Sequence, residues 1–209
     1  MKIHALTVGA LGVNCYILED EATKEALLVD PGDEAGSILA EIEKRQLKVK
    51  YIVNTHGHAD HIGANTEVKK ALQVPLSIHR EDADMLGDAK KNLSAFCGKP
   101  VFSPAADFFL EDSGQIVLGN TALTILHTPG HTPGGICLYT KGVLFSGDTL
   151  FAESVGRCDF PGGNMNELLA GIQKKLLILP DETVVYPGHG PATQIGWEKK
   201  HNLYLQEAQ

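Results

Sequence analysis

Four side chains able to bind a metal crowd into six consecutive positions of the chain. They are His56, His58, Asp60 and His61. Imidazole and carboxylate groups are ligands of zinc, manganese and iron, so the stretch indicates a transition-metal site. A catalytic site needs further ligands, which other parts of the chain have to supply.

The stretch lies where a predicted strand gives way to a predicted helix. Residues 50–53 form an apolar run typical of a buried strand, and residues 63–73 have the pattern of a helix. Side chains alternate in an extended segment, so we expect His56, His58 and Asp60 to point the same way. The last histidine of the stretch would then enter from the start of the helix.

Three further fragments share one arrangement, a short apolar strand followed by a ligand in a Gly/Pro turn. The ligands in these turns are His131, Asp148 and His189. If the strand ends meet at one edge of the sheets, these side chains converge on the first motif. The complete set would contain five histidines and two carboxylates. Four fragments that each follow a strand are a far more specific signal than any single Pro-Gly-His.

The order of the fragments resembles the metallo-β-lactamase superfamily over essentially the whole chain. The matching motifs are Thr-His-x-His-x-Asp-His, Pro-Gly-His, Gly-Asp-Thr and a second Pro-Gly-His. Segments 147–151, 156–163 and 187–191 are most similar to short glyoxalase II-like, or hydroxyacylglutathione hydrolase-like, enzymes. The resemblance implies an α/β (α+β) protein, folded as a four-layer αβ/βα sandwich with a dinuclear metal site at one end.

The resemblance also implies how two divalent ions share the ligands, with Asp148 bridging both. The first ion would take His56, His58 and His131, and the second would take Asp60, His61 and His189. Zinc is the expected metal, and iron and manganese suit the same donors. Each ion keeps a coordination position for a bridging hydroxide. Asp60 and Asp148 are assigned to catalysis as well as to metal binding.

The implied activity is hydrolysis of a small-molecule thioester by that hydroxide. Metal ions lower the pKa of water from 15.7 to about 7, and a thiolate with a pKa near 8.5 leaves without much protonation. An alternative is a persulfide dioxygenase, which shares the fold and a Gly-Arg-x-Asp-Phe segment but uses one iron held by two His and one Asp. A non-catalytic metal-dependent binding protein is a third hypothesis. A β-lactamase is disfavoured because the sequence shows no export signal.

Two further residues are assigned through the resemblance. Arg157 stands where glyoxalase II-like enzymes carry a basic residue that holds a carboxylate of the thiol, and a surface ion pair is its alternative role. Asp30 matches a carboxylate that orients a ligating imidazole, and a plain turn residue is its alternative. Asp159 and Gly190 replace tyrosines of the classical enzymes, and the sequence ends at Gln209 without their helical domain. These departures leave the identity of the thiol, glutathione or another, open.

Composition narrows the classes of partner. The 209 residues suit one domain, 1–209. A net charge of -8, from 18 basic and 26 acidic residues, lacks the basic footprint of a nucleic-acid-binding protein. No window approaches the roughly 18 apolar residues of a membrane span. With no signal peptide recognised at the N-terminus, we expect a cytoplasmic protein that acts on a small molecule.

Hydrophobic patterning predicts alternating strands and helices. Predicted strands cover residues 3–8, 14–18, 25–29, 50–53, 75–79, 108–110, 115–118, 121–127, 135–139, 143–146 and 183–186. Predicted helices cover residues 34–45, 63–73, 80–86, 166–177 and 197–206, and residues 87–107 form a long connection. Strands followed by helix in each half are compatible with two stacked sheets flanked by helices.

The remaining cysteines and histidines fit no ligand position. Four cysteines form no CxxC pair, so neither disulfides nor a zinc knuckle is expected; they are Cys15, Cys97, Cys137 and Cys158. Four histidines are expected to be surface or packed residues, namely His4, His79, His127 and His201. His127 is the closest of these to a proposed ligand, four positions before His131.

Overall fold

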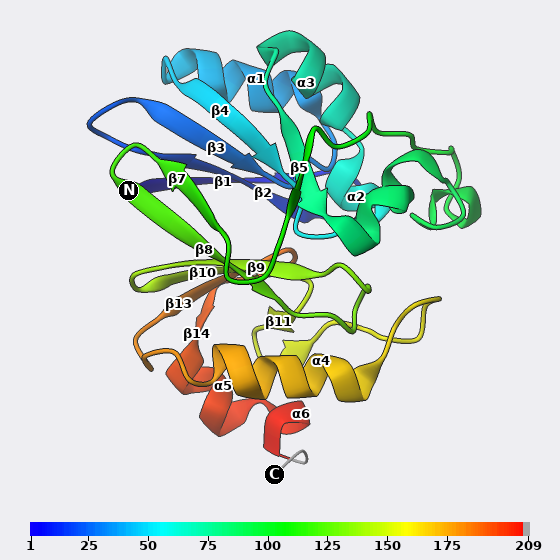
Figure 1. Cartoon of the computed structure of the whole chain (residues 1–209), viewed down its shortest axis with the longest axis vertical. Coiled ribbons are helices and arrows are strands. Elements are labelled where there is room, and N and C mark those ends of the chain that lie inside the picture. The colour runs from blue at the N-terminus through cyan, green and yellow to red at the C-terminus, as the bar shows by residue number, and fades with distance from the viewer. Residues whose placement is uncertain (207–209) are drawn as a thin grey trace.

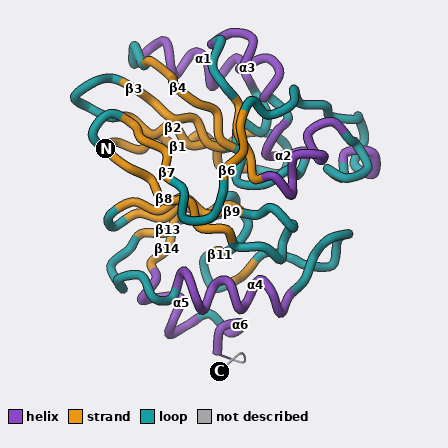
Figure 2. Tube along the Cα trace, viewed as in Figure 1, coloured by secondary structure: helices purple, strands orange, loops and turns teal. Residues whose placement is uncertain are grey.

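The computed structural model describes residues 1–206 and has four layers, helix, sheet, sheet and helix (Figure 1). Two six-stranded sheets face each other in the middle, in the orders β1-β2-β3-β4-β5-β6 and β14-β13-β10-β9-β8-β7. Figure 2 shows the strands in the centre and the helices on both outer faces. The predicted αβ/βα sandwich is confirmed.

The first sheet is antiparallel at one side and parallel at the other. Its strands are β1 (Lys2–Val8), β2 (Val13–Glu19), β3 (Glu25–Val29), β4 (Lys48–Val53), β5 (Leu76–His79) and β6 (Phe108–Leu110). Strands β1, β2 and β3 pair antiparallel, and β3, β4, β5 and β6 pair parallel. The parallel strands end at one edge of the sheet, where the loop after β4 carries the first metal motif.

The second sheet is mostly antiparallel. Its strands are β7 (Gln115–Leu118), β8 (Thr121–His127), β9 (Ile136–Thr140), β10 (Val143–Gly147), β13 (Val184–Pro187) and β14 (Thr193–Gln194). Strands β8 and β10 each pair antiparallel with β9, and β13 is parallel to β10, so β8, β10 and β13 run in the same direction. Their carboxyl ends therefore meet at one edge.

Helices cover both outer faces of the sandwich. Over the first sheet lie α1 (Ala35–Lys44) and α3 (Asn65–Leu72), with the single turn α2 (Ala59–Ile62) and the 3₁₀ segments η1 (Arg80–Gly87) and η2 (Ser94–Phe96). Over the second sheet lie α4 (Met165–Gly171), the π-helical η3 (Ile172–Leu176), α5 (Ile195–His201) and α6 (Leu203–Gln206). None of the helices described is long and apolar enough to cross a membrane.

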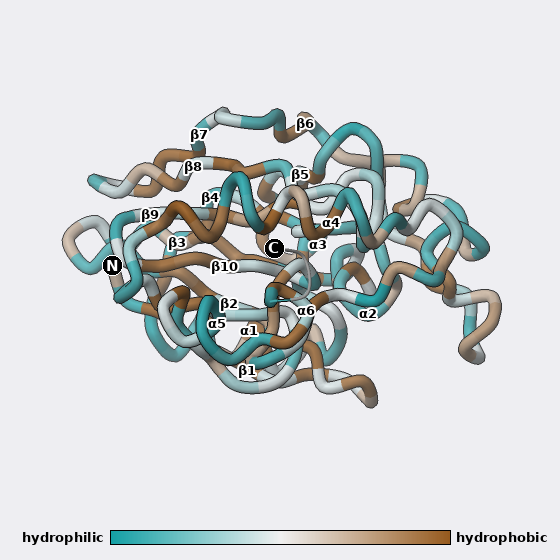
Figure 3. Tube along the Cα trace, turned by 90° about the horizontal axis from the view of Figure 1, so that it is seen from below, coloured by the Kyte–Doolittle hydropathy of each residue, from teal (hydrophilic) through white to brown (hydrophobic). Residues whose placement is uncertain are grey.

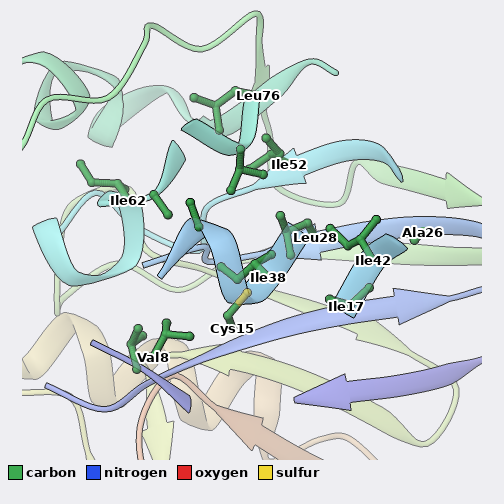
Figure 4. Packing of buried hydrophobic residues seen from close by; sticks show 14 of the residues in the cluster. Val8, Cys15, Ile17, Ala26, Leu28, Ile38, Ile42, Ile52, Ile62 and Leu76 are labelled. Atoms are coloured by element: carbon green, nitrogen blue, oxygen red, sulfur yellow. The ribbon is translucent and has the colours of Figure 1, made fainter. Parts of the chain in front are cut away.

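Successive side chains of a strand point to opposite faces of the sheet, so each sheet contributes to a separate hydrophobic core on either face. In β2, Cys15 and Ile17 pack under the helices of the first layer, whereas Tyr16 and Leu18 pack between the sheets. Figure 4 shows Cys15 beside Ile38 and Ile17 beside Ile42, both residues of α1. A strand buried on both faces contains apolar residues in succession, and Figure 3 shows such a hydrophobic stretch along β10. A third core lies under α4 and α5.

Most predicted elements exist, and the differences concern helix limits and short strands. The helix predicted over 63–73 corresponds to α3, and the separate helical turn α2, which begins at Ala59, was not predicted. The helix predicted over 197–206 is divided, because Asn202 leaves the helical conformation between α5 and α6. Sequence patterns missed β14 and the two-residue strands β11 (Leu150–Phe151) and β12 (Ser154–Val155), which are too short to show periodicity.

Candidate metal centre

The first motif lies in the loop between β4 and α2, and its geometry differs from the expected extended segment. Asn54 donates its backbone N–H to the Ser77 carbonyl at 2.9 Å and continues the sheet, after which the chain bends. His58 is the N-cap of α2, so Asp60 lies in the first turn of that helix. The prediction that Asp60 alternates along an extended chain was therefore wrong, because helical structure begins at Ala59, four residues before the predicted helix.

The other three ligands follow the parallel strands of the second sheet. His131 lies in the loop after β8, Asp148 directly follows β10, and His189 lies two residues after β13. Because these strands run in the same direction, their carboxyl ends bring the three side chains to the edge that faces α2.

Three imidazoles form the first group of candidate ligands. The donor atoms of His56, His58 and His131 all lie within 4.8 Å of one another. His58 Nδ1 and His131 Nε2 are 2.9 Å apart. Nitrogen ligands of a tetrahedral zinc ion are separated by roughly 3.3 Å, given Zn–N distances of about 2.0 Å, so the two rings already face a common point.

A second group lies beside the first. Asp60, His61 and His189 also place their donor atoms within 4.8 Å of one another. His189 Nε2 is 3.2 Å from Asp60 Oδ2 and 3.3 Å from His61 Nε2. The two imidazoles and the carboxylate therefore converge as a metal ligand set does.

Asp148 lies between the two groups. Its Oδ2 is 3.5 Å from His131 Nε2 of the first group and 3.7 Å from His189 Nε2 of the second. Its Oδ1 is 3.4 Å from His61 Nε2. One carboxylate therefore contacts both groups, the position that a bridging ligand requires.

Unpaired buried atoms mark where the ions fit. Among the described residues, buried polar side-chain atoms without a hydrogen-bond partner include His56 Nε2 and Asp148 Oδ1. Buried polar atoms are nearly always paired, so two unpaired atoms within one cluster of candidate ligands fit a bound cation. The donor set, five imidazoles and two carboxylates, suits divalent transition metals.

Burial keeps two imidazoles of the first group, those of His56 and His58, in the form that binds metal. It lowers the pKa of His56 well below the ordinary value and lowers the pKa of His58 to about 3. Both rings are therefore neutral at pH 7, with nitrogen lone pairs available to an ion.

The chain is similar in sequence and structure to known metal-binding proteins. A family profile described as the metallo-beta-lactamase superfamily matches residues 8–189. The chain belongs to the metallo-β-lactamase superfamily. It is 37% identical to the hydroxyacylglutathione hydrolase GloC of Haemophilus influenzae, over 98% of each chain.

Two solved structures of the superfamily are also similar. BLEG-1 B3 metallo-beta-lactamase has a TM-score of 0.93 and 37% identity, with 98% of this chain and 99% of that chain covered. TTHA1623 in a di-iron-bound form has a TM-score of 0.87 and 36% identity, with 97% and 100% covered. The protein is thus a member of a metallo-hydrolase superfamily whose fold binds divalent metal ions.

Three imidazoles of the two groups also have a hydrogen-bond partner at the ring nitrogen that faces away from the cluster. His61 Nδ1 lies 2.9 Å from Asp30 Oδ2. His131 Nδ1 donates to the Arg157 carbonyl at 2.7 Å, and His189 Nδ1 to the Leu11 carbonyl at 3.2 Å. Such partners fix the tautomer and orientation of a metal-binding imidazole. Sequence reasoning singled out Asp30 but missed both carbonyls, which no residue type reveals.

Close packing brings α2 against the loop that carries Asp30. A Cβ atom on Gly32 would lie 1.7 Å from the Asp60 carbonyl oxygen, so only glycine fits there. Asp30 itself is buried with a φ of 49°, and its Oδ1 accepts the Thr55 N–H at 2.7 Å. The tight turn after β3 thus places a carboxylate under the metal motif.

A pocket of about 520 Å³ opens over the ligands. Its apolar wall is made by Leu11, Ala59, Leu93, Phe151, Val155 and Phe160. Asn92 and Ser94 of the connection predicted over 87–107 line it as well, and Figure 1 shows that connection at the same end of the molecule as α2. The site thus offers a small organic molecule apolar contacts next to the proposed metals.

Arg157 lines the pocket but already has an anionic partner. Its Nε and Nη2 atoms donate to the two carboxylate oxygens of Asp159 at 2.8 Å each. The guanidinium also stacks on the Phe160 ring, 4.0 Å from its centroid, and that ring meets His58 edge-on. Hydrogen bonds from Arg157 lower the pKa of Asp159 to about 2. Any anion that Arg157 binds has to compete with this carboxylate.

The remaining histidines and cysteines lie apart from the ligand groups. The His79 ring stacks on the His127 ring with their centroids 3.9 Å apart, and Glu81 lies near both. His79 Nδ1 accepts a hydrogen bond from the Glu81 N–H, and His127 Nε2 donates one to the Pro133 carbonyl. One ring nitrogen of each histidine is therefore already hydrogen-bonded within the protein. His4 pairs with a buried glutamate and His201 stacks on a tryptophan. All four cysteines are free, as predicted.

Proposed function

We propose that the protein hydrolyses thioesters at a dinuclear metal site formed by the two ligand groups and Asp148. The observation that supports this most directly is the position of Asp148 between the groups, 3.5 Å from His131 and 3.7 Å from His189. In this assignment His56, His58 and His131 hold one ion, and Asp60, His61 and His189 hold the other.

The proposed roles follow from the donor groups. Two divalent ions bound there would activate water at neutral pH and polarise the substrate carbonyl. Asp148 would hold them at a fixed separation. Asp30 would keep His61 in the tautomer that presents Nε2, because its carboxylate accepts from Nδ1.

The pocket lining favours a leaving group that needs no strong acid. Besides the proposed ligands, its polar side chains are Asn92, Ser94, Cys97, Ser154 and Arg157. The amides, hydroxyls and guanidinium among them do not release a proton near pH 7. A thiolate, with a pKa near 8.5, leaves without one, whereas an alkoxide requires protonation. This contrast supports a thioester over an ordinary ester.

The acyl group and thiol are expected to be small and partly apolar. The pocket holds about 520 Å³ between aliphatic and aromatic side chains, which suits such a substrate. Arg157 is the cation that lines it, and we infer that Arg157 recognises a carboxylate on the thiol only where that carboxylate displaces Asp159. Thioesters of uncharged thiols should therefore also be good substrates.

The test is a substrate panel assayed on protein of measured metal content. The panel contains thioesters of carboxylated and uncharged thiols, a β-lactam, and a glutathione persulfide monitored by oxygen uptake. Thioester hydrolysis with two metal ions per chain is the expected result. One iron per chain with oxygen consumption would instead identify a persulfide dioxygenase, and preferential cleavage of the β-lactam would identify a lactamase.

Zinc is the metal we propose, because neutral imidazoles and carboxylates suit it. The similar protein TTHA1623 is described in a di-iron-bound form, so metal analysis should include iron and manganese. Elemental analysis of protein purified without added metal, for zinc, iron and manganese, identifies the bound metal.

A further inference from the structure

Asp82 is a buried carboxylate that sequence reasoning did not single out. It lies in η1, and its side chain is surrounded by protein, with an exposed fraction of 0%. Its Oδ2 accepts the Gly57 N–H at 3.0 Å and the Thr132 hydroxyl at 2.7 Å, and its Oδ1 accepts the Gly134 N–H at 2.6 Å. Burial raises the pKa of Asp82, and the three donors offset part of the cost of burying its charge.

The donors belong to the two loops that carry the first group of ligands. Gly57 lies between His56 and His58, and Thr132 directly follows His131. These loops come from different sheets and are more than 70 positions apart in sequence. One backbone bond, from the Ile136 N–H to the Thr55 carbonyl, joins the bases of the same loops. Asp82 joins them again, next to the ligands.

The packing around Asp82 leaves little freedom. A Cβ atom on Gly134 would lie 2.6 Å from the Asp82 nitrogen, and one on Gly57 would lie 2.5 Å from the Met85 Cβ. Both loops therefore press their glycines against η1. A shift of η1 would change the separation of His58 and His131, whose nearest nitrogens are 2.9 Å apart.

We propose that Asp82 is a positioning residue that sets the distance between the His56/His58 loop and the His131 loop, and so preorganises the first metal site. This role rests on the metal site proposed above. The carboxylate is required because it offers two acceptor oxygens. An asparagine would keep one of them and direct an N–H group at a backbone N–H.

Asp20 provides a matched control at the other end of the sandwich. It is also buried, and it accepts hydrogen bonds from the Thr23 N–H, the Thr23 hydroxyl and the Asn120 N–H. It likewise joins the two halves, since Asn120 lies between β7 and β8. Because β2 separates Asp20 from the metal edge by seven residues, or roughly 23 Å, its loss should leave the ligands in place.

The experiment compares the wild-type protein with D82N, T132V, T132S and D20N. Stripped protein is titrated with Co²⁺ in competition with a chelator, and the visible spectrum reports coordination at each step. Unfolding by urea without metal gives the stability of each variant. T132V removes one donor to Asp82 and is the milder change if D82N folds poorly, whereas T132S keeps the hydroxyl.

In D82N and T132V, we expect the affinity for one of two ions to fall by about 10- to 100-fold, with an altered Co²⁺ spectrum, while the other ion is retained. T132S and D20N should bind both ions like the wild type, even where D20N is less stable. Wild-type affinities in both D82N and T132V would overturn the role of Asp82, as would equal losses in D82N and D20N. A wild-type protein that binds no ion would overturn the metal site itself.

Discussion

Asp30 directly follows β3 and His61 lies in α2, after the neighbouring parallel strand β4, and their Oδ2 and Nδ1 atoms are 2.9 Å apart. Both side chains are buried, with 2% and 0% exposed. Asp30 also accepts two hydrogen bonds from Thr55, the residue before the first ligand. The carboxylate thus joins the start of the metal motif to its last histidine.

The substitution D30N should weaken binding of the ion assigned to His61 by about 10- to 100-fold, because the amide loses the charge that aligns the ring. Competition titration with a chelator measures the effect. D33N removes an exposed carboxylate three positions away and serves as the control. Unchanged affinity in D30N would reduce Asp30 to a turn residue.

The substitution D148A should release both ions and reduce thioesterase activity by roughly 1,000-fold, because bridging and transition-state stabilisation disappear together. Metal analysis after gel filtration gives the stoichiometry. H189A, which removes a ligand from one group only, should retain one ion per chain. A D148A protein with two bound ions would refute the bridging role.

Because Arg157 is paired with Asp159, substitutions of these two residues should have opposite effects on the KM for thioesters of carboxylated thiols. R157A should raise KM for thioesters of carboxylated thiols by roughly 10-fold, because a charge-assisted hydrogen bond is lost. D159N should lower KM for the same substrates, because it frees the guanidinium. Steady-state kinetics with a matched uncharged thioester provide the comparison. Equal changes for both substrates would make Arg157 a structural residue that holds Phe160.

The depressed pKa of His58 predicts a pH-dependent stability. Burial lowers this pKa from 6.5 to about 3, so below pH 6.5 the unfolded chain takes up a proton that the folded chain does not. The free energy of unfolding is therefore unaffected by His58 above pH 6.5 and decreases as the pH falls below it, because proton uptake stabilises the unfolded chain. Between pH 7.5 and 5.0, metal-free wild type should lose about 2 kcal/mol relative to H58Q. Urea unfolding at both pH values tests this, and a constant difference would contradict it.

Local features made the sandwich and the ligand types readable from the sequence. Apolar runs that end in Gly/Pro turns predicted most strands, because hydrophobic periodicity and turn preferences act over a few neighbouring residues. Because these patterns reflect only neighbouring residues, they failed to predict where α2 begins. The onset of α2 at Ala59 depends on contacts with distant loops, including the bond from its N–H to the Asn92 carbonyl at 3.0 Å.

The sequence by itself determined the chemical character of the centre, histidines and aspartates placed after strands, and the superfamily to which the chain belongs. Only the tertiary structure decided how these groups meet. The position of Asp148, the partner of Arg157 and the contacts of Asp82 all depend on strand direction, sheet packing and backbone groups. The physical reason is distance along the chain: Asp82 and Gly134 are 52 positions apart, and only the stacking of two sheets brings them within 2.6 Å.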